Sequence, residues 1–381
     1  MSVDEGDTMI EIREVVTKRD WRRFHAFPNN LYKDNAYFVP AIRMDEAPTF
    51  DPKKNPAYEY CETVAYLAWR GSQVVGRVAA IINHKLNAMK EMKRMRFTRW
   101  DVIDDLAVSR ALFEAIEGWG RDKGMESLIG PIGFSDLDKE GMLIEGFDQL
   151  SMIITLYNHP YYADHLEALG FAKDVDWVEY KVFVPKEIDP RVERISTIAQ
   201  KRHGYRLVEF KNKKEVIPYA KEMFHMYNES YGDLYGFCPL TDAQIDIAVK
   251  QFFSLVSLDY IYVVVDKENA VIGFGIMAPS FAPAFKASGG RLFPFGIFRI
   301  LRAFRHHEVL DMFLIAVKPE YFGRGVAAVI MNEGLKRAIS NGVKWAETGP
   351  ELENNEYVRT LWSGFKTEQH KRRRCYIKQL A

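Results

Sequence analysis

Two glycines that lie one residue apart, where a strand is expected to lead into a helix, are the clearest chemical feature of the sequence. They belong to the segment Lys318–Val326, which reads KPEYFGRGV. Glycine lets the backbone turn its N–H groups toward a ligand and lets that ligand approach closely. The start of a helix adds unpaired N–H donors and a positive dipole end. The pattern predicts a diphosphate site, although a plain tight turn would also use two such glycines.

The elements on either side of this loop follow from their apolar pattern. Residues 311–317 (DMFLIAV) form a continuous apolar run that is typical of a buried strand. Apolar or small residues then recur from Ala327 to Ile339 at the spacing of one helical face, and Asn341-Gly342 ends that helix. The glycines are therefore expected in a strand–loop–helix unit, which is the setting that a phosphate-binding turn requires.

The same succession of elements occurs twice along the chain. Strand pairs with a short polar turn are predicted at 64–82 and again at 260–278, and each half ends in a further strand, at 175–184 and 372–380. Repetition on this scale predicts two tandem domains of the α/β (α+β) class. Each domain is expected to hold a mixed, mostly antiparallel sheet flanked by helices. The expected boundaries are a disordered tail at 1–8, an N-terminal domain at 9–185, a linker helix at 186–202 and a C-terminal domain at 203–381.

The segment FLIAVKPEYFGRGVAA resembles motif A of the GCN5-related N-acetyltransferases (GNAT). In that family a strand leads into [Gln/Arg]-x-x-Gly-x-[Gly/Ala], and the loop binds the pyrophosphate of acetyl-CoA. Phe322 stands where the family usually has Gln or Arg. Residues 352–365 resemble the family's Asn…Leu-Tyr…Gly-Phe segment, with Trp362 in place of the tyrosine that often serves as general acid. The resemblance implies the GNAT fold for 203–381, and two tandem GNAT-like domains overall.

The resemblance also implies a cosubstrate and the residues that hold it. The cosubstrate would be acetyl-CoA or a longer acyl-CoA, with its pantetheine arm along the strand that precedes the loop. The acceptor would be an amine of a small molecule or of an amino-acid derivative. The residues expected to contact CoA are Leu314, Ile315, Ala316, Val317, Phe322, Gly323, Arg324, Gly325, Val326, Ala327, Asn355 and Trp362.

Acyl transfer to an amine requires that the amine be neutral, so a general base is expected near the thioester. The candidates are Glu308, Asp311 and Glu347, and Tyr357 is a candidate proton donor to the thiolate. Each has an ordinary structural alternative: an exposed strand carboxylate for Glu347, a strand-end residue for Asp311 and core packing for Tyr357. The nine histidines offer no HxH or HExxH pattern, so no metal site is expected.

The first half shows less of this chemistry. Where motif A should stand, residues 96–110 read RFTRWDVIDDLAVSR and contain no Gly-x-Gly. Asp101, Asp104 and Asp105 instead precede a helix expected at 111–124. Acidic residues suit a helix start as caps, but they would repel a diphosphate. The first half is therefore predicted to be a degenerate copy that does not bind CoA; the alternative is that another loop binds it.

Residues 280–307 interrupt the expected passage from the second hairpin to strand 311–317. This insertion contains six phenylalanines, and Arg299, Arg302 and Arg305 recur at threefold spacing near its end. A loop of this length in a compact domain is usually functional or disordered, and its aromatic content argues against disorder. We expect it to cap the acceptor side of the second half with its apolar side buried. A domain contact, a hydrophobic tunnel wall and a membrane-surface helix are the alternatives.

Two further segments stand out by composition. Residues 130–148 are rich in glycine and acidic residues, and we expect a solvated loop or a wall of the acceptor site. Residues 371–374 read KRRR, and within a final strand they are expected to form a charged sheet edge.

Composition narrows the class of protein. With 48% hydrophobic and 27% charged residues the chain is an ordinary globular protein, which excludes disordered and fibrous classes. Lys+Arg and Asp+Glu both number 52, and this zero net charge disfavours a nucleic-acid binder. Three scattered cysteines and a polar N-terminus without an apolar h-region lead us to expect a cytoplasmic protein with reduced thiols. The sequence predicts an acyl-CoA-dependent N-acyltransferase; a non-catalytic acyl-CoA-binding or regulatory protein is the alternative.

Overall fold

The computed structural model describes residues 9–41, 43–232 and 234–380, with the backbone alone at residues 43–45, 251–255 and 357–359. The tail expected at 1–8 lies outside the described residues. The chain folds into two compact units. The first contains the described residues up to Trp177, Ala282–Gly296 and the residues from Lys371 onward; the second contains Val178–Phe281 and Ile297–His370.

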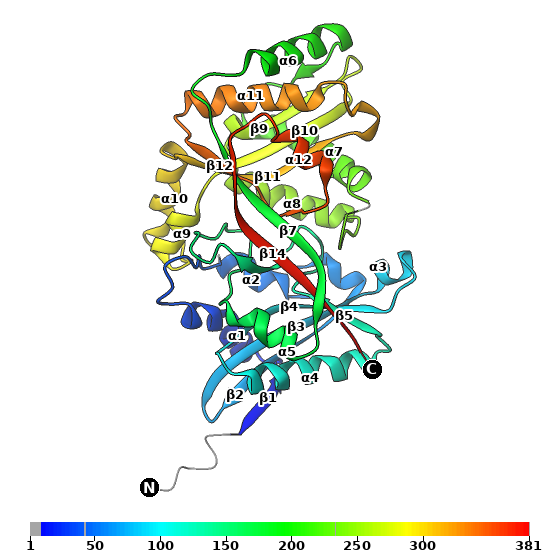
Figure 1. The fold of residues 1–381 in the computed structure, drawn as a ribbon, viewed down its shortest axis with the longest axis vertical. Helices are drawn as coiled ribbons and strands as arrows, with labels where there is room; N and C mark the ends of the chain where they lie inside the picture. The colour runs from blue at the N-terminus through cyan, green and yellow to red at the C-terminus, as the bar shows by residue number, and fades with distance from the viewer. Residues whose placement is uncertain (1–8, 42, 233, 381) are drawn as a thin grey trace. The chain divides into compact units, whose positions relative to one another are not determined.

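A mostly antiparallel sheet forms the centre of the first unit (Figure 1). Its strands are ordered β1-β2-β3-β4-β5-β14, and only β4 and β5 are parallel. The short strand β6 pairs with β14 as well. The bounds are β1 Ile10–Glu14, β2 Cys61–Arg70, β3 Gln73–Asn83, β4 Arg94–Val102, β5 Ser127–Gly130, β6 Met142–Glu145 and β14 Thr367–Gln379, of which residues from 371 lie in this unit.

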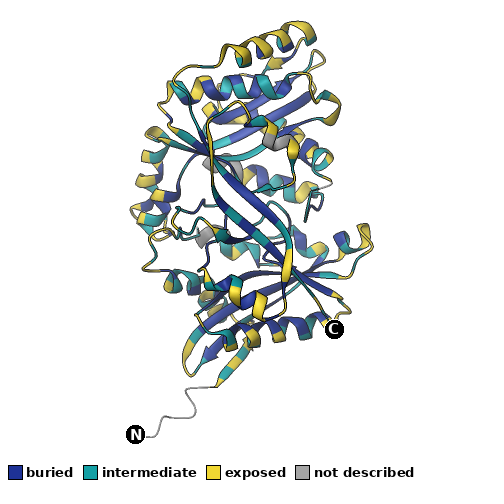
Figure 2. Cartoon of the chain, viewed as in Figure 1, coloured by how far each residue is buried: buried dark blue, intermediate teal, exposed yellow. Residues whose placement is uncertain are grey.

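Strand side chains of the first unit alternate between two apolar cores. Val64 and Ala68 pack in the core that contains Leu112 of α4, whereas Ala65 and Leu67 pack in a second core that contains aromatic residues of α1 and of the loop after α2. Successive strand residues point to opposite faces, so both faces of this sheet need covering, and Figure 2 shows buried strands beneath helices with exposed outer faces. The helices are α1 Lys18–Leu31, α2 Arg43–Thr49, η2 Pro56–Glu59, α3 His84–Met89, α4 Leu106–Asp122, α5 Tyr161–Ala168 and α9 Ala282–Ser288.

The second unit is built around a sheet of the same kind. Its strands are ordered β7-β12-β11-β10-β9-β8, and only β11 and β12 are parallel. The short strand β13 pairs with β7. The bounds are β7 Ala172–Phe183, of which residues from 178 lie in this unit, β8 Arg206–Leu207, β9 Ile261–Val265, β10 Val271–Pro279, β11 Val309–Val317, β12 Trp345–Glu347 and β13 Glu351–Leu352.

Helix α11 confirms the periodicity that predicted a helix at 327–339. It spans Val326–Ser340, and its buried residues include Ile330, Leu335 and Ala338. Helix α6, expected as a linker, lies along α11 and contributes Ala199 to the same apolar core (Figure 1). It is therefore part of the second unit. The remaining helices of this unit are α7 Lys213–Ser230, α8 Asp242–Leu255, η3 Leu258–Tyr260, α10 Gly296–Arg305, η4 Pro319–Tyr321 and α12 Glu356–Leu361, and α6 spans Pro190–His203.

The final strand of each half contributes to the sheet of the other unit. Residues Lys181–Phe183 pair with β12 in the second unit, and residues 376–379 pair with β5 in the first. The sequence indicated that 175–184 would close the first half and 372–380 the second. Alternating side chains identify a strand but not its partner, so two similar final strands can be exchanged without any change in their local pattern.

Several local expectations need correction in the first unit. The helix expected at 111–124 begins at Leu106, because Asp105 caps it by accepting a hydrogen bond from the N–H of Ala107. The KRRR segment at 371–374 is not a charged edge: Lys371 and Arg373 are buried, and Arg374 donates from Nε to Oδ1 of Asp176 at 2.8 Å. The first part of the insertion, α9, belongs to the first unit, where Lys286 Nζ donates to the carbonyl of Asn35 at 2.9 Å.

None of the helices in the described part of the chain is both long and apolar enough to cross a membrane. Cys61, Cys238 and Cys375 are buried, and no disulfide joins them.

Candidate functional site

The glycine loop lies between strand β11 and helix α11, as the sequence predicted. Gly323 and Gly325 both adopt left-handed backbone conformations, with φ of +71° and +85°. Gly325 is the N-cap of α11, and no side chain caps the helix by a hydrogen bond. The first N–H groups of a helix lack partners within the helix. The loop therefore combines two left-handed glycines, an exposed Arg324 and an uncapped helix start, which suits an anion.

Close packing explains why glycines surround the start of α11. A Cβ atom on Gly325 would lie 2.7 Å from Cβ of Ala199 on α6, whereas one on Gly323 would have no heavy atom within 4 Å. On β10, a Cβ on Gly273 would lie 2.5 Å from Val326 Cγ1. Gly273 and Gly325 thus let α11 fit between the sheet and α6. Gly323 is free of such contacts, so its space is open to a ligand.

Strands β11 and β12 separate from one another before β11 reaches this loop. Their parallel ladder is limited to three residue pairs, of which the last joins Asp311 and Glu347. On its other side β11 contains a bulge at Phe313 where it pairs with β10, and such bulges bend a strand. The carbonyl of Ile315 accepts a hydrogen bond from the hydroxyl of Tyr231 at 2.6 Å. The divergence opens β11 along the stretch where the pantetheine arm is predicted to lie.

Of the residues predicted along that stretch, Leu314 and Ile315 are half-buried, whereas Ala316 and Val317 pack their side chains into the core. Ala316 and Val317 can therefore offer a ligand only their backbone groups. Phe322, at the position where the family usually has a polar residue, has an exposed side chain.

Four buried ionisable side chains gather where the ladder ends. Asp311 and Glu347 are partners in register, so their side chains point to the same face of the sheet. His370 Nε2 lies 3.2 Å from Glu347 Oε1, and both side chains are buried. Glu179 is buried as well, and the ligand atoms of Glu179, Glu347 and His370 all lie within 4.8 Å of one another. Two carboxylates and an imidazole at this spacing can move protons or hold a metal ion.

The sequence named only part of this cluster. It identified Asp311 and Glu347, and the structure brings both together in a buried position, so Glu347 is not the exposed carboxylate that was its alternative. It missed Glu179 and His370, which lie on β7 and β14, the two strands that contribute to both units. No local spacing links these residues to Glu347, and the expectation that no metal site exists rested on local spacing alone.

Another carboxylate, outside this cluster, lies on β13 and belongs to the half-buried Glu351. The indole Nε1 of Trp362 donates to Glu351 Oε1 at 2.9 Å. Burial raises the pKa of Glu351 to about 7, against the lowering effect of hydrogen bonds from Trp362 and Thr348. Trp362 was expected to contact CoA in place of a tyrosine; in the structure it is buried and orients this carboxylate. A carboxyl group with a pKa near neutrality can donate or accept a proton in catalysis.

The other candidates lie elsewhere. Glu308 is exposed and forms a surface ion pair with Lys344 at 2.7 Å, so the structure places it outside the buried cluster. Asn355 is half-buried, and its N–H donates to the carbonyl of Leu352 at 2.9 Å. Tyr357 belongs to α12, but its side chain lies outside the described residues.

The equivalent opening in the first unit is filled by the chain itself. Strands β4 and β5 also pair in parallel over only three residues and then diverge after Arg96. Beyond that point Ile132 N–H donates to the carbonyl of Phe97 at 2.9 Å, and Arg96 Nη1 donates to the carbonyl of Gly133 at 2.8 Å. Residues 130–135 are buried, so this stretch is not the solvated loop that was expected.

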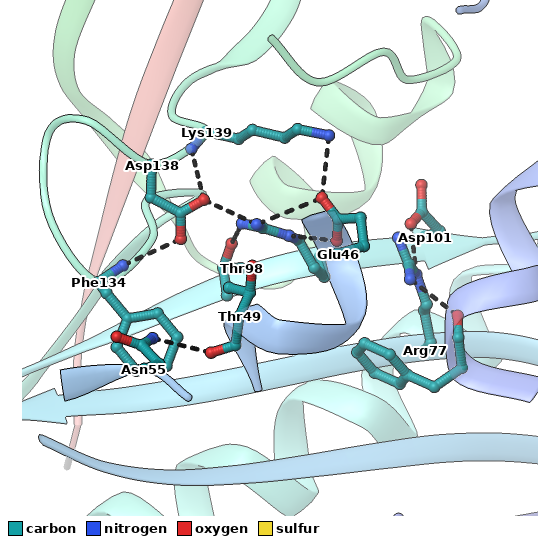
Figure 3. A network of polar contacts seen from close by, with 11 residues as sticks. Glu46, Thr49, Asn55, Arg77, Thr98, Asp101, Phe134, Asp138 and Lys139 are labelled. Atoms are coloured by element: carbon teal, nitrogen blue, oxygen red, sulfur yellow. Dashed lines mark hydrogen bonds and ion pairs between the residues drawn. The ribbon is translucent and has the colours of Figure 1, made fainter. Parts of the chain in front are cut away.

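Charged groups fix that filling segment in place (Figure 3). Buried Arg99 donates from Nη2 to Asp138 Oδ1 at 2.7 Å and from Nε to Glu46 Oε2 at 3.3 Å. Lys139 Nζ lies 3.0 Å from Glu46 Oε1. Arg99 also donates to the hydroxyl of Thr98 at 2.9 Å. A stretch of strand held in this way has no room for a pantetheine arm, which supports the prediction that the first half does not bind CoA.

Part of the chain matches a known protein family, and two known proteins are similar to it over nearly their whole length. Residues 220–361 match the family described as Acetyltransferase (GNAT) family. The chain is 27% identical over 379 residues to Protein YghO of Escherichia coli (strain K12), which covers 97% of this chain and 95% of that protein. It is 26% identical over 394 residues to the Bacterial ceramide synthase of Caulobacter vibrioides (strain NA1000 / CB15N), with 100% of both chains covered.

Among solved structures, a tandem GNAT protein from the clavulanic acid biosynthesis pathway, solved without AcCoA, superimposes with a TM-score of 0.55. The two are 13% identical, and the match covers 98% of this chain and 99% of that one. This likeness concerns the fold, and it extends over both halves of the chain. The family match covers strand β11, the glycine loop and α11, which are the elements that carry motif A. Residues 220–361 thus match the GNAT acetyltransferase family, and the chain as a whole has the tandem GNAT fold.

Proposed function

We propose that the chain transfers an acyl group from acyl-CoA to the nitrogen of an amine, and that the second unit alone binds the CoA. One observation carries this proposal. Strands β11 and β12 diverge directly after Asp311 and Glu347, so an open stretch of β11 runs between the glycine loop and a buried acid–base cluster. A thioester laid along that stretch would have its diphosphate at one end and its carbonyl near the cluster.

The loop would hold the diphosphate through its backbone. The N–H groups of Val326 and Ala327 lie at the uncapped start of α11, and Arg324 can add a positive charge through its side chain, since its own N–H already donates to the carbonyl of Tyr321 at 3.2 Å. The backbone of residues 314–316 would then lie alongside the pantetheine arm and contact it. Phe322 changes little in this scheme, because a phosphate cradle made of backbone donors does not depend on the side chain at that position.

The cluster would remove the proton of the reacting amine. The amine nitrogen attacks the thioester carbonyl, a C–N bond forms, the C–S bond breaks and the CoA thiolate leaves. We assign the proton that the nitrogen loses to His370, directly or through a water molecule. Glu347, 3.2 Å from the imidazole, fixes the ring and compensates the charge that the ring gains. Asp311 and Tyr357 stay candidates for the base and for the acid that protonates the thiolate.

The donor and acceptor classes are parts of the same proposal. Acetyl-CoA and longer acyl-CoA would both fit a site that recognises the CoA moiety. The full-length likeness to a protein named a bacterial ceramide synthase favours a fatty acyl donor and a long-chain amine acceptor over acetyl transfer to a small amine. A cytoplasmic location, expected from the sequence, goes with an acyl-CoA substrate.

Release of free CoA thiol tests the proposal directly. The full chain is incubated with acetyl-CoA or palmitoyl-CoA and with an amine panel that runs from amino acids to sphingoid bases, and the amide product is identified by mass spectrometry. We expect amine-dependent thiol release that falls by about 100-fold or more in His370→Gln without a change in the acyl-CoA Kd. Acyl-CoA binding with no amide formed from any amine would contradict the proposal.

A further inference from the structure

The second half of the insertion presents apolar side chains to solvent. Phe293, Phe295, Phe298 and Leu301 are 71%, 69%, 65% and 50% exposed. The expectation that the insertion buries its apolar side is therefore wrong for these residues. Isolated exposed apolar residues are normal, but four within nine consecutive positions of the sequence are a concentration of the kind that occurs at interaction sites.

Burial of the same segment is selective. Phe281 and Phe285 are fully buried in the core, and the ring of Phe304 lies 4.9 Å from that of Phe281. Helix α10 thus has an inner apolar face, which includes Ile300 and Phe304, and its own core contact is complete without Phe298 or Leu301. The exposed aromatics are surplus to the packing of the helix.

Basic residues stand among the exposed apolar ones. On α10 Arg302 is four residues after Phe298, and Arg305 is four residues after Leu301, so each arginine is a neighbour of an apolar side chain on the helix surface. Both arginines are exposed, and so is Arg291 before the helix. No acidic residue occurs from 280 to 307. The surface is therefore apolar and positively charged at once.

We propose that residues 291–305 bind the surface of a lipid bilayer that contains anionic phospholipids. Phenylalanine and leucine side chains would enter the boundary between headgroups and acyl chains, while neighbouring arginines bind lipid phosphates; this is the composition of helices that lie in the membrane interface. The charge decides the partner: a segment with exposed apolar residues, neighbouring arginines and no acidic residue of its own is complementary to an anionic headgroup layer. A long-chain acyl-CoA or amine that partitions into the membrane would then meet the enzyme at the membrane surface.

That last step rests on the proposed function, but membrane binding itself does not. Vesicle binding is measured without acyl-CoA or amine, so failure of the catalytic proposal leaves it untouched, and the reverse holds as well. The two ideas therefore have separate tests.

The test is co-sedimentation of the full chain with sucrose-loaded vesicles of phosphatidylcholine, with and without phosphatidylglycerol. We expect binding to the anionic vesicles that weakens as NaCl is raised, because salt screens the arginine–phosphate attraction. Arg302→Gln with Arg305→Gln should lower the partition coefficient by about 30-fold, at about 5-fold for each arginine. Phe298→Ser with Leu301→Ser should lower it by at least about 10-fold.

Matched controls separate this surface from general charge and hydrophobicity. Arg19→Gln with Arg22→Gln on α1 removes the same charge from another exposed helix, and Ile217→Ser removes an exposed apolar side chain on α7. Both controls should bind like the unchanged protein. Absence of binding to anionic vesicles, or equal losses in controls and test variants, would overturn the proposal. So would a dimer in light scattering that becomes a monomer in Phe298→Ser with Leu301→Ser, since the surface would then be a contact between two copies.

Discussion

Placing a negative charge at Gly323 tests the phosphate loop most cleanly. Gly323 has open space around its Cβ position, whereas a Cβ on Gly325 would lie 2.7 Å from Ala199 Cβ. A side chain at position 325 would displace α6, so a loss of CoA affinity could then come from a disturbed fold and not from the added charge. Gly323→Glu is therefore the informative variant, and Gly323→Gln is its matched control, because the two side chains have the same shape and differ only in charge.

The backbone cost of the substitution is shared by both variants. A non-glycine residue at the φ of +71° costs about 1 to 2 kcal/mol of folding free energy. The added carboxylate acts on binding alone. At about 6 Å from a diphosphate that carries two charges, in an exposed site with an effective dielectric constant of about 40, the repulsion is about 3 kcal/mol. Salt will reduce it, so we expect at least about 2 kcal/mol, or about a 30-fold rise in the Kd of CoA.

Titration calorimetry with CoA at low and moderate salt measures this difference. Gly323→Gln should bind within a few-fold of the unchanged protein, and the gap between the two variants should narrow as NaCl is added. Thermal unfolding checks that the two variants are equally stable. If Gly323→Glu binds CoA as tightly as Gly323→Gln, the diphosphate does not lie at this loop, and the assignment of residues 322–327 fails.

Three further outcomes follow from the packing and the charges. Gly325→Ala should lower the free energy of unfolding by about 2 to 4 kcal/mol, because alanine is strained in the left-handed conformation and its Cβ overpacks against Ala199. In urea denaturation, adding Ala199→Gly should recover the part of this loss that is due to overpacking. If nothing is recovered, the two positions are not in contact. The folded-state pKa of Glu351 is raised from 4.5 to about 7, so its carboxyl should make stability fall as pH rises from about 4.5 to 7, by about 3 kcal/mol. Glu351→Gln should lack that fall in melts across this pH range, and an unchanged pH profile would refute the raised pKa. Arg99→Leu should lower the free energy of unfolding by about 3 to 5 kcal/mol, because it leaves buried carboxylates without their positive partner. CoA affinity, measured by calorimetry, should not change; a change would contradict the prediction that the first half takes no part in binding.

Much of the local structure was determined by the sequence alone. The helix expected at 327–339 is α11, Val326–Ser340, and the two hairpins expected at 64–82 and 260–278 are β2–β3 and β9–β10. Gly323 and Gly325 do adopt the left-handed conformations that favour glycine. These features follow from side-chain periodicity and backbone sterics, which act over a few residues and can be read along the chain.

Tertiary structure decided which residues meet. Glu179 and His370 lie near Glu347 only because β7 pairs with β12 and β14 pairs with β7. The partner of each strand is an edge contributed by residues far away in the sequence. The same holds in the first half, where the opening of the sheet is filled by residues 130–135 and not by a ligand loop. Phe298 and Ile300 lie on one short helix, yet one is exposed and the other buried. Apolar character alone cannot separate them, because burial depends on what packs against the helix, and that is fixed only when the whole chain has folded.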